Sequence, residues 1–266
     1  MEKRVYAEEI AMRIEGATVA EVDKANGIIL TGIAVPIAEN VKANVYIDSM
    51  YDIDMTIDEA VAEINHIVEE RKKHNPVPDM SCFSNFDKMK GHLKARLYNK
   101  ATVAEVSKSA SEYGFDDLII VPYLEITLNG GYGAIKVLEN HLETWGKTAE
   151  EVIAIAEENS ANETMITPMA EMLGMSSDML PPGTPMMMVV SNDSEACGAY
   201  GIIAKMEYLK EKFPEGFAVL PSSIHEVIVM SLAGVDEDAL TSMVKEVNAT
   251  EVVAEEQLSD HAYFFR

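Results

Sequence analysis

Apolar residues near the start of the chain alternate with polar ones, at the period of two that is typical of half-buried strands. After an opening helix, Thr18–Val22 and Ile28–Val35 are predicted to form a hairpin. Asn26-Gly27 lies between them, and this pair accepts the positive φ angles of a tight turn. A third strand is expected at Ala43–Asp48. The first fifty residues therefore favour a small antiparallel sheet.

Helical spacing replaces this alternation from Thr56 onward. Thr56 and Glu59 have the spacing of a capping box, which satisfies free N–H groups at the start of a helix. The apolar residues of one helical face follow: Ile57, Val61, Ile64 and Val68. A polar run from His74 to Ser84 with two prolines then suggests a boundary. We therefore predict an N-terminal α+β unit of residues 1–75 and a larger α+β unit of residues 85–266, with one compact domain as the alternative.

Hairpins and helices alternate again in the larger unit. A long strand is predicted from Leu118 to Leu128, and Thr148 with Glu151 forms a second capping box. The stretch Met165–Pro185 is interpreted as a connection rich in Met and Pro. Further strands are expected at Met186–Ser191, near Gly198, and at Phe217–Leu220, Ile224–Met230 and Ala262–Phe265, with helices over Ile202–Phe213 and Leu240–Val247. This irregular alternation predicts an α+β fold of mainly antiparallel sheets.

Acidic residues outnumber basic ones by 45 to 21, which gives a net charge of −24. Nucleic-acid affinity comes largely from Lys and Arg side chains that displace counterions, so direct nucleic-acid binding is not expected. Strong acidity also fits simple solubility, or occupation of a basic protein groove that normally holds nucleic acid.

Cysteine usage and hydrophobicity favour the cytoplasm. Cys82 and Cys197 are too few and too far apart for a disulfide framework or a C-x-x-C zinc site. The N-terminus lacks the apolar core of a signal peptide, and no uncharged apolar run is long enough to span a bilayer. Glu63 and His66 have the E-x-x-H spacing of carboxylate metal sites, but a second copy is missing. We therefore expect a cytoplasmic protein without a membrane span, a metal or a cofactor.

Hydroxyl, imidazole and carboxylate groups gather in the last fifty residues. The catalytic candidates are Ser222, Ser223, His225, Glu226, Asp260 and His261. In this hypothesis Ser223 is the nucleophile, and His225 or His261 is the base. Asp260 would orient the base. No strained G-x-S-x-G elbow surrounds Ser223, so the alternative is that these groups are satisfied within strands and turns.

Two other segments are candidates for binding a ligand or a partner. His141 and Trp145 lie four residues apart on a short predicted helix, where they either stack on a partner or anchor the core. Eight of the 17 methionines lie between Met165 and Met188, and the candidates among them are Met165, Met169 and Met172. Flexible thioethers either line an adaptable binding surface or fill gaps in a core.

Several motifs along the chain resemble those of one protein family. They are Asn26-Gly27 with Leu30 and Gly32, Val45-Tyr46-Ile47-Asp48, Asn140-His141-Leu142-Glu143-Thr144-Trp145-Gly146, Leu220-Pro221-Ser222-Ser223-Ile224-His225-Glu226-Val227-Ile228, Met243-Val244-Lys245-Glu246-Val247-Asn248 and Leu258-Ser259-Asp260-His261-Ala262-Tyr263-Phe264. Over nearly its whole length the chain resembles an uncharacterised bacterial family common in Gram-positive anaerobes and on their mobile elements. It departs from that pattern at Ala43 and Asn44, where similar proteins carry a proline and a hydroxyl residue. The resemblance implies recurring residues and no established activity.

Three functional hypotheses follow. The leading one is a non-enzymatic cytoplasmic accessory protein that acts by binding another protein, with a role in mobile-element biology implied by the resemblance alone. The second is a hydrolase that uses the Ser, His and Asp residues named above. The third is an acidic nucleic-acid mimic that occupies a basic groove of its partner.

Overall fold

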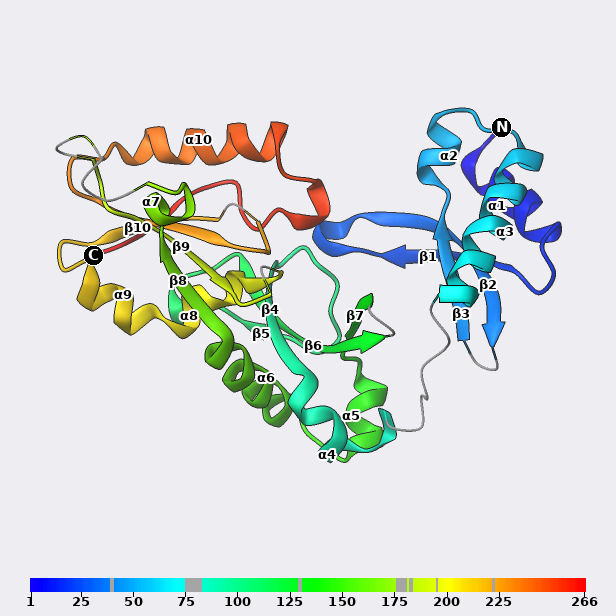
Figure 1. Ribbon diagram of the computed structural model, residues 1–266, viewed down its shortest axis with the longest axis horizontal. Coiled ribbons are helices and arrows are strands. Elements are labelled where there is room, and N and C mark those ends of the chain that lie inside the picture. Colours follow the sequence, from blue (N-terminus) through cyan, green and yellow to red (C-terminus); the bar gives the residue numbers. More distant parts are fainter. Residues whose placement is uncertain are drawn as a thin grey trace. The chain divides into compact units, whose positions relative to one another are not determined.

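The computed structural model describes residues 1–38, 41–74, 83–128, 131–175, 181, 184–194, 196–221 and 223–266. Within these residues the strands form three sheets in an α+β architecture, as predicted (Figure 1). The chain divides into two compact units. The first comprises Met1–Ser81 with Ile126–Gly133, and the second comprises Cys82–Glu125 with Ala134–Arg266.

Unit 1 is built on a three-stranded antiparallel sheet in the order β1-β2-β3. Its elements are α1 (Lys3–Met12), β1 (Thr18–Asp23), β2 (Ile29–Ala38), β3 (Val41–Tyr46), α2 (Asp48–Asp52) and α3 (Ile57–His74). Asn26 and Gly27 both have positive φ, as the hairpin prediction requires. The turn is wider than two residues, because the last strand pair is Asp23 with Ile29.

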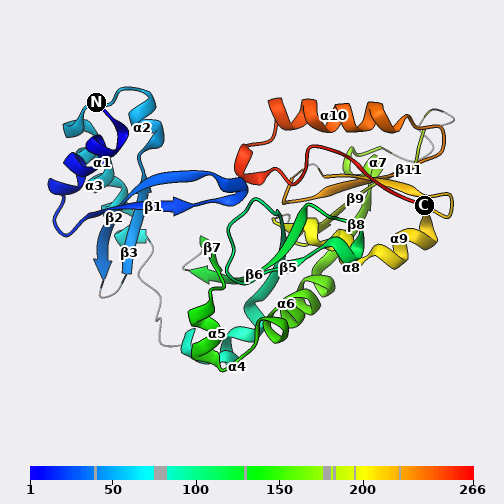
Figure 2. The same cartoon turned by 180° about the vertical axis from the view of Figure 1, so that it is seen from behind.

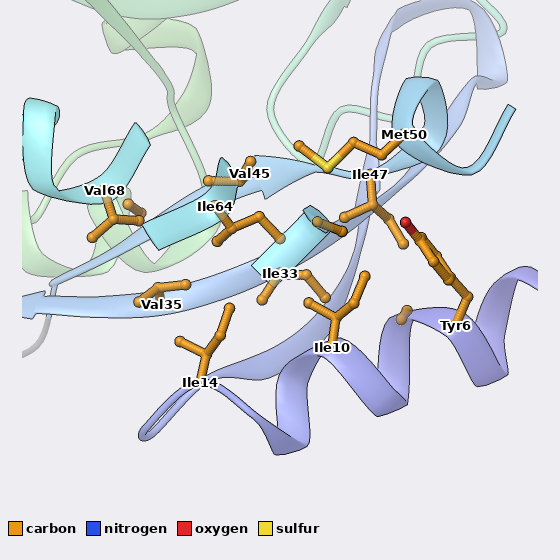
Figure 3. Close-up of a cluster of buried hydrophobic side chains, with 13 residues drawn as sticks. Tyr6, Ile10, Ile14, Ile33, Val35, Val45, Ile47, Met50, Ile64 and Val68 are labelled. Atoms are coloured by element: carbon orange, nitrogen blue, oxygen red, sulfur yellow. The ribbon is translucent and has the colours of Figure 1, made fainter. Parts of the chain in front are cut away.

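One apolar core holds this unit together. Ile10 of α1, Ile33 of β2 and Ile64 of α3 are fully buried and belong to one cluster of apolar side chains (Figure 3). The capping box at the start of α3 forms as predicted, since the Thr56 N–H donates to Glu59 Oε2 at 3.0 Å and the Glu59 N–H donates to Thr56 Oγ1 at 3.4 Å. The periodicity of α3 therefore places its apolar face on the sheet.

The first sheet of unit 2 is centred on β6, and only the end of β6 and the start of β7, within Ile126–Gly133, are assigned to unit 1. Its elements are α4 (Phe86–Met89), β4 (Leu93–Asn99), β5 (Lys108–Ser109), β6 (Leu118–Leu128), β7 (Gly131–Lys136), α5 (Glu139–Trp145) and α6 (Ala149–Glu163). Strand β6 pairs with β4, β5 and β7. Helix α6 lies along β4, where the Ala95 N–H donates to Ser160 Oγ at 2.8 Å and Asn159 Nδ2 donates to the Leu93 carbonyl at 2.9 Å.

The second sheet of unit 2 has five strands in the order β12-β10-β11-β9-β8. Its elements are β8 (Thr164–Pro168), α7 (Met169–Met172), β9 (Met187–Asn192), α8 (Gly201–Ala204), α9 (Met206–Lys212), β10 (Phe217–Leu220), β11 (Val227–Ser231), α10 (Glu237–Thr250) and β12 (Tyr263–Phe265). Helix α10 packs on one face through Leu240 and Val244, and α8 and α9 lie on the other side (Figures 1 and 2). Both faces of the sheet centre are therefore covered.

Three local predictions for this region were wrong. Gly198–Tyr200 is a 3-10 helix and not a return strand. The helix expected over Ile202–Phe213 is interrupted at Lys205, which separates α8 from α9. Strand β11 begins only at Val227, because the backbone before it bonds to other loops: the His225 carbonyl accepts from the Gly198 N–H, and the Ile224 N–H donates to the Glu256 carbonyl.

Candidate functional site

The Ser-His segment forms a tight turn between β10 and β11. Ser222 lies outside the described residues. Ser223 is only 7% exposed, and its Oγ accepts a hydrogen bond from the backbone N–H of His225 at 3.0 Å. The Ser223 N–H in turn donates to the Glu226 carbonyl at 3.3 Å. The predicted nucleophile is therefore engaged in closing its own turn, in the way that Ser side chains commonly stabilise turns.

Both ring nitrogens of His225 have partners. Nδ1 accepts from the backbone N–H of Cys197 at 3.1 Å, so in this hydrogen-bond arrangement the ring proton is assigned to Nε2. Nε2 lies 3.3 Å from Glu256 Oε1. The His225 carbonyl also accepts from Ser191 Oγ at 3.0 Å. The imidazole thus connects its own turn to the segments that carry Cys197 and Glu256. These two residues, and not the Ser223 hydroxyl, are the partners of its ring nitrogens.

A buried ion pair lies beside this turn. Arg96 donates through Nη2 and Nε to Glu125 Oε1, at 2.7 and 3.2 Å, and its guanidinium lies over the ring of Tyr123 at 4.5 Å. Burial raises the pKa of the nearby Cys197 thiol, and the Arg96 charge opposes this rise only in part. The cavity that Glu125 and Cys197 help to line has a volume of about 10 Å³. That volume accommodates about one water molecule and no organic substrate.

The second candidate motif is tied to a residue far away in the sequence. Ser259 Oγ donates to Asp117 Oδ2 at 2.8 Å, and Tyr263 Oη donates to Asp117 Oδ1 at 2.6 Å. The His261 Nδ1 lies 2.9 Å from Ser259 Oγ. Because an ionised carboxylate only accepts, the Ser259 proton points to Asp117, and Nδ1 of His261 is the donor to Ser259. Serine therefore lies between imidazole and carboxylate, whereas a catalytic triad places the imidazole in the middle.

Asp260, the predicted orienting acid, is exposed and accepts from Asn248 Nδ2 at 3.0 Å. The carboxylate that accepts the hydrogen bond from Ser259 Oγ is that of Asp117. Burial, with the bond to Asp117, raises the pKa of Tyr263. Among the hydrogen bonds of the described residues, none links Ser223 to Asp260 or His261. The catalytic candidates fall into two separate networks.

His141 and Trp145 anchor the start and end of α5. Nδ1 of His141 accepts from the Leu138 N–H at 3.1 Å, and its ring stacks on Trp145 with 5.6 Å between the ring centroids. Trp145 is 9% exposed and donates through Nε1 to the Phe83 carbonyl at 2.7 Å. Burial lowers the pKa of His141. Both side chains are used within unit 2.

Large apolar side chains are exposed around β8 and α7. Met165 on β8 is 51% exposed and Met172 on α7 is 58% exposed, whereas Met169 is half-buried. We define the methionine surface as the exposed apolar residues of this region: Met165, Met172, Leu173, Met175 and Met186. Strand β8 continues directly from α6, runs into α7 and forms one edge of the five-stranded sheet (Figure 1).

Basic residues are missing from the sequence around this surface. No Lys, Arg or His occurs between Lys147 and Lys205, although nine Asp and Glu residues do. Lys94 reaches the region from β4, and its ammonium pairs with Glu163 at the end of α6. The methionine surface is therefore apolar within a negatively charged segment, a combination that separate counts of Met and of charge do not reveal.

Other hollows occur elsewhere on the described residues. A groove of about 80 Å³ between α10 and the sheet is lined by Leu220, Ile228, Met243 and other residues, and is well below the roughly 300 Å³ of small-molecule sites. Two open hollows of about 460 and 530 Å³ lie in unit 1. In the larger one, Tyr6 Oη donates to the Met55 carbonyl, so its phenol is already bonded within the fold.

Within the described ranges, no three His, Cys, Asp or Glu side chains are grouped so that they could hold a metal ion, and Glu63 and His66 on α3 are no exception. In the same ranges, every helix is too short or too polar to cross a bilayer.

Comparison with known proteins identifies the family of the chain. Searches of curated proteins and of solved structures found no match. A family of unknown function, DUF5688, matches residues 5–266, which include all the motifs on which the sequence resemblance rests. The chain therefore belongs to the DUF5688 family.

Proposed function

We propose that the protein is a cytoplasmic accessory protein that acts by binding another protein through the methionine surface. The observation that carries the proposal is the exposure of five large apolar side chains in and around β8 and α7 of unit 2, between residues 165 and 186. Single exposed apolar residues are ordinary, but several large ones within one short stretch of chain favour a surface that another molecule covers. Methionine suits such a role because its unbranched thioether adapts to the shape of a partner.

The hydrogen bonding of the catalytic candidates supports a binding role over hydrolysis. Ser223 and His225 hold a turn, and Ser259 and His261 hold the C-terminal segment against Asp117. A nucleophile needs a base within hydrogen-bond reach and room for a substrate. The polar cavity beside Cys197 accommodates about one water.

Composition supports the remaining parts of the proposal. Two distant cysteines suit a reducing compartment, and a net charge of −24 disfavours nucleic acid and favours a protein with basic groups. The proposed link to mobile elements rests only on the family resemblance. It enters the proposal as the setting in which a partner should be sought.

The test is a comparison of matched surface variants. The protein and its Met165→Gln/Met172→Gln variant are immobilised and exposed to cytosolic extract of the source organism, and the captured proteins are quantified by mass spectrometry. Gln is close to Met in shape, so the variant removes apolar contact without adding charge. We expect a partner of the parent protein to be depleted about tenfold, the scale of losing interface anchor residues.

Met12→Gln is the control, since Met12 is 73% exposed but lies on α1 in unit 1. This variant should capture the partner as the parent does. Equal capture by all three proteins would overturn the proposal, as would covalent labelling of Ser223 by a serine-directed probe together with hydrolytic activity.

A further inference from the structure

Among the described residues, none pairs with the outer edge of β8, so its backbone groups can pair with an added strand. The sheet order ends at β8, which pairs with β9 in the register Met165 with Ser191 and Thr167 with Val189. In an antiparallel sheet the N–H and C=O groups of successive residues point alternately to the two neighbouring strands. Which β8 residues point outward therefore follows from a single hydrogen bond in the ladder.

That bond lies between β9 and β11. The Ser231 N–H donates to the Met186 carbonyl at 3.1 Å, one step beyond the pair Met230 with Met187. The backbone groups of Met186 therefore point to β11, and by alternation those of Val189 and Ser191 point to β8. Their partners Thr167 and Met165 point back to β9.

The outward groups on β8 consequently belong to Thr164, Ile166 and Pro168. Ile166 presents an N–H and a C=O, while Pro168 has no N–H and presents only a carbonyl. Exposed edge groups of this kind are the template that an added strand uses. With more acceptors than donors, the edge suits a segment that supplies several N–H groups.

Side-chain direction places an apolar contact next to this edge. Residues that are paired across neighbouring strands project from the same face of a sheet. Thr167 pairs with Val189, which pairs with Ile228, and Ile228 packs against the apolar cluster that contains Leu240 and Val244 of α10. Met165 lies two residues from Thr167 and pairs with Ser191. Met165 therefore projects from the α10 face of the sheet. A strand added outside β8 would place alternate side chains beside Met165.

Charge decides what kind of strand fits. The segment from Lys147 to Lys205 has nine acidic residues and no intervening basic ones, and the chain has a net charge of −24. Two copies of the chain would repel each other because both are acidic. Their pairing through β8 would also bring together two edges that each have more acceptors than donors. A cationic segment is attracted and brings its own N–H donors.

We infer that the edge of β8 receives an extended, basic segment of another protein as an additional strand, with alternate apolar side chains packed beside Met165. This inference rests on the proposed function, because it specifies how the partner occupies the methionine surface. The probe is a synthetic peptide, acetyl-Lys-Val-Lys-Val-Lys-Val-Lys-amide. In antiparallel addition the valines beside Met165 turn their N–H groups away from β8, and the lysines between them supply the N–H groups that face Ile166. The control peptide therefore carries backbone N-methyl groups on the two inner lysines, which keeps the charge and removes the N–H groups of the edge that faces β8.

Titration calorimetry and residue-resolved hydrogen exchange provide the readouts. We expect the parent peptide to bind and to slow exchange of the Ile166 amide about tenfold, as formation of a strand hydrogen bond requires. The N-methylated peptide should bind at least about tenfold more weakly, since each lost backbone bond is worth about that factor. Equal binding of both peptides with unchanged exchange at Ile166 would overturn the inference.

A protein variant tests the same bond from the other side. Proline is tolerated in an edge strand where the N–H faces outward, so Ile166→Pro should fold and should bind the parent peptide about tenfold more weakly. Ile166→Val, which keeps the N–H, should bind as the parent protein does. If the proline variant does not fold, the N-methylated peptide on the parent protein still decides the question.

The two proposals fail in different ways. If the peptides and Ile166→Pro behave like their controls while Met165→Gln/Met172→Gln still loses its partner, strand addition is wrong and binding through the methionine surface stands. If the Met variant retains its partner as well, the proposed function is also wrong.

Discussion

The polar networks and the methionine surface of unit 2 use their side chains in opposite ways. His225, Ser259 and Asp117 belong to residue types that perform catalysis, yet their hydrogen bonds connect segments of the fold. Met165 and Met172 are chemically inert and largely exposed. The difference teaches that catalytic residue types indicate function only when their hydrogen-bonding capacity is left free for a substrate.

This comparison has an energetic consequence. Removing one member of a buried polar pair leaves its partner desolvated, which costs more than the hydrogen bond itself contributes. Removing an exposed apolar side chain changes folding little. Substitutions in the polar networks should therefore lower the free energy of unfolding, and substitutions on the methionine surface should affect binding alone.

The largest effect is expected at the buried ion pair. Arg96→Met leaves Glu125 buried without its guanidinium partner, and should lower the free energy of unfolding by about 3–5 kcal/mol. Denaturant titration followed by circular dichroism measures this loss. The double variant Arg96→Met/Glu125→Leu removes both charges and should recover most of it. A loss below about 1 kcal/mol in the single variant would show that this pair does little for the fold.

The next effect is expected at Gly198, where backbones cross. A Cβ placed on Gly198 would lie 2.5 Å from the Asn192 nitrogen, closer than the chain allows. Gly198→Ala should cost about 1–3 kcal/mol, because the loop that presents Cys197 to His225 must shift. Gly91→Ala is the control, since no atom lies within 4 Å of its Cβ. Equal melting temperatures for the two variants would contradict the close packing described here.

A similar or smaller effect is expected at the C-terminal network. Ser259→Ala removes the hydroxyl that donates to Asp117 and accepts from His261, at a cost of about 1–3 kcal/mol. Asp260→Ala changes an exposed residue with one bond to Asn248 and should cost less than about 1 kcal/mol. Denaturant titration of both variants checks the order. The reverse order would restore Asp260 as the key acid of this motif.

Local patterns in the sequence predicted much of this architecture. The capping boxes at Thr56 and Thr148 rely on residues three positions apart, and both form. The positive φ angles of Asn26 and Gly27 and the antiparallel α+β class were also predicted correctly. These features depend on neighbours within one or two turns of the chain, which hydrophobic period and residue type report directly.

Partners distant in the sequence could not be predicted in this way. Asp117 lies 142 positions from Ser259, and Cys197 lies 28 positions from His225. Only the folded sheet brings these groups together, and a single sequence has no signal for such pairs. The strand β8 was missed for another reason: its two threonines and its proline resemble a loop, and it becomes a strand by pairing with β9. The edge that carries the proposed function therefore lay inside a predicted connection.

A pH effect on stability is expected at the half-buried His141. Burial lowers the pKa of His141, and its Nδ1 must stay unprotonated to accept from Leu138. The unfolded chain therefore binds more protons, and stability should fall as the pH drops from the unfolded pKa near 6.5 toward the lower folded value. His141→Asn should flatten this part of the stability profile, which thermal unfolding followed by circular dichroism across this pH range measures. Identical profiles for the parent and His141→Asn would show that this cap does not depend on pH.

The smallest effect on folding is expected where the effect on binding is largest. Met165→Gln/Met172→Gln replaces two exposed thioethers with amides of similar shape, so the free energy of unfolding should change by less than about 0.5 kcal/mol per site. Denaturant titration of the variant used in the capture experiment provides the measurement. A loss above about 2 kcal/mol would mean that these methionines pack within unit 2, and the contrast with the polar networks would disappear. An unchanged unfolding free energy together with lost capture would separate the binding surface from the residues that hold the fold, because stability and binding would then depend on different side chains.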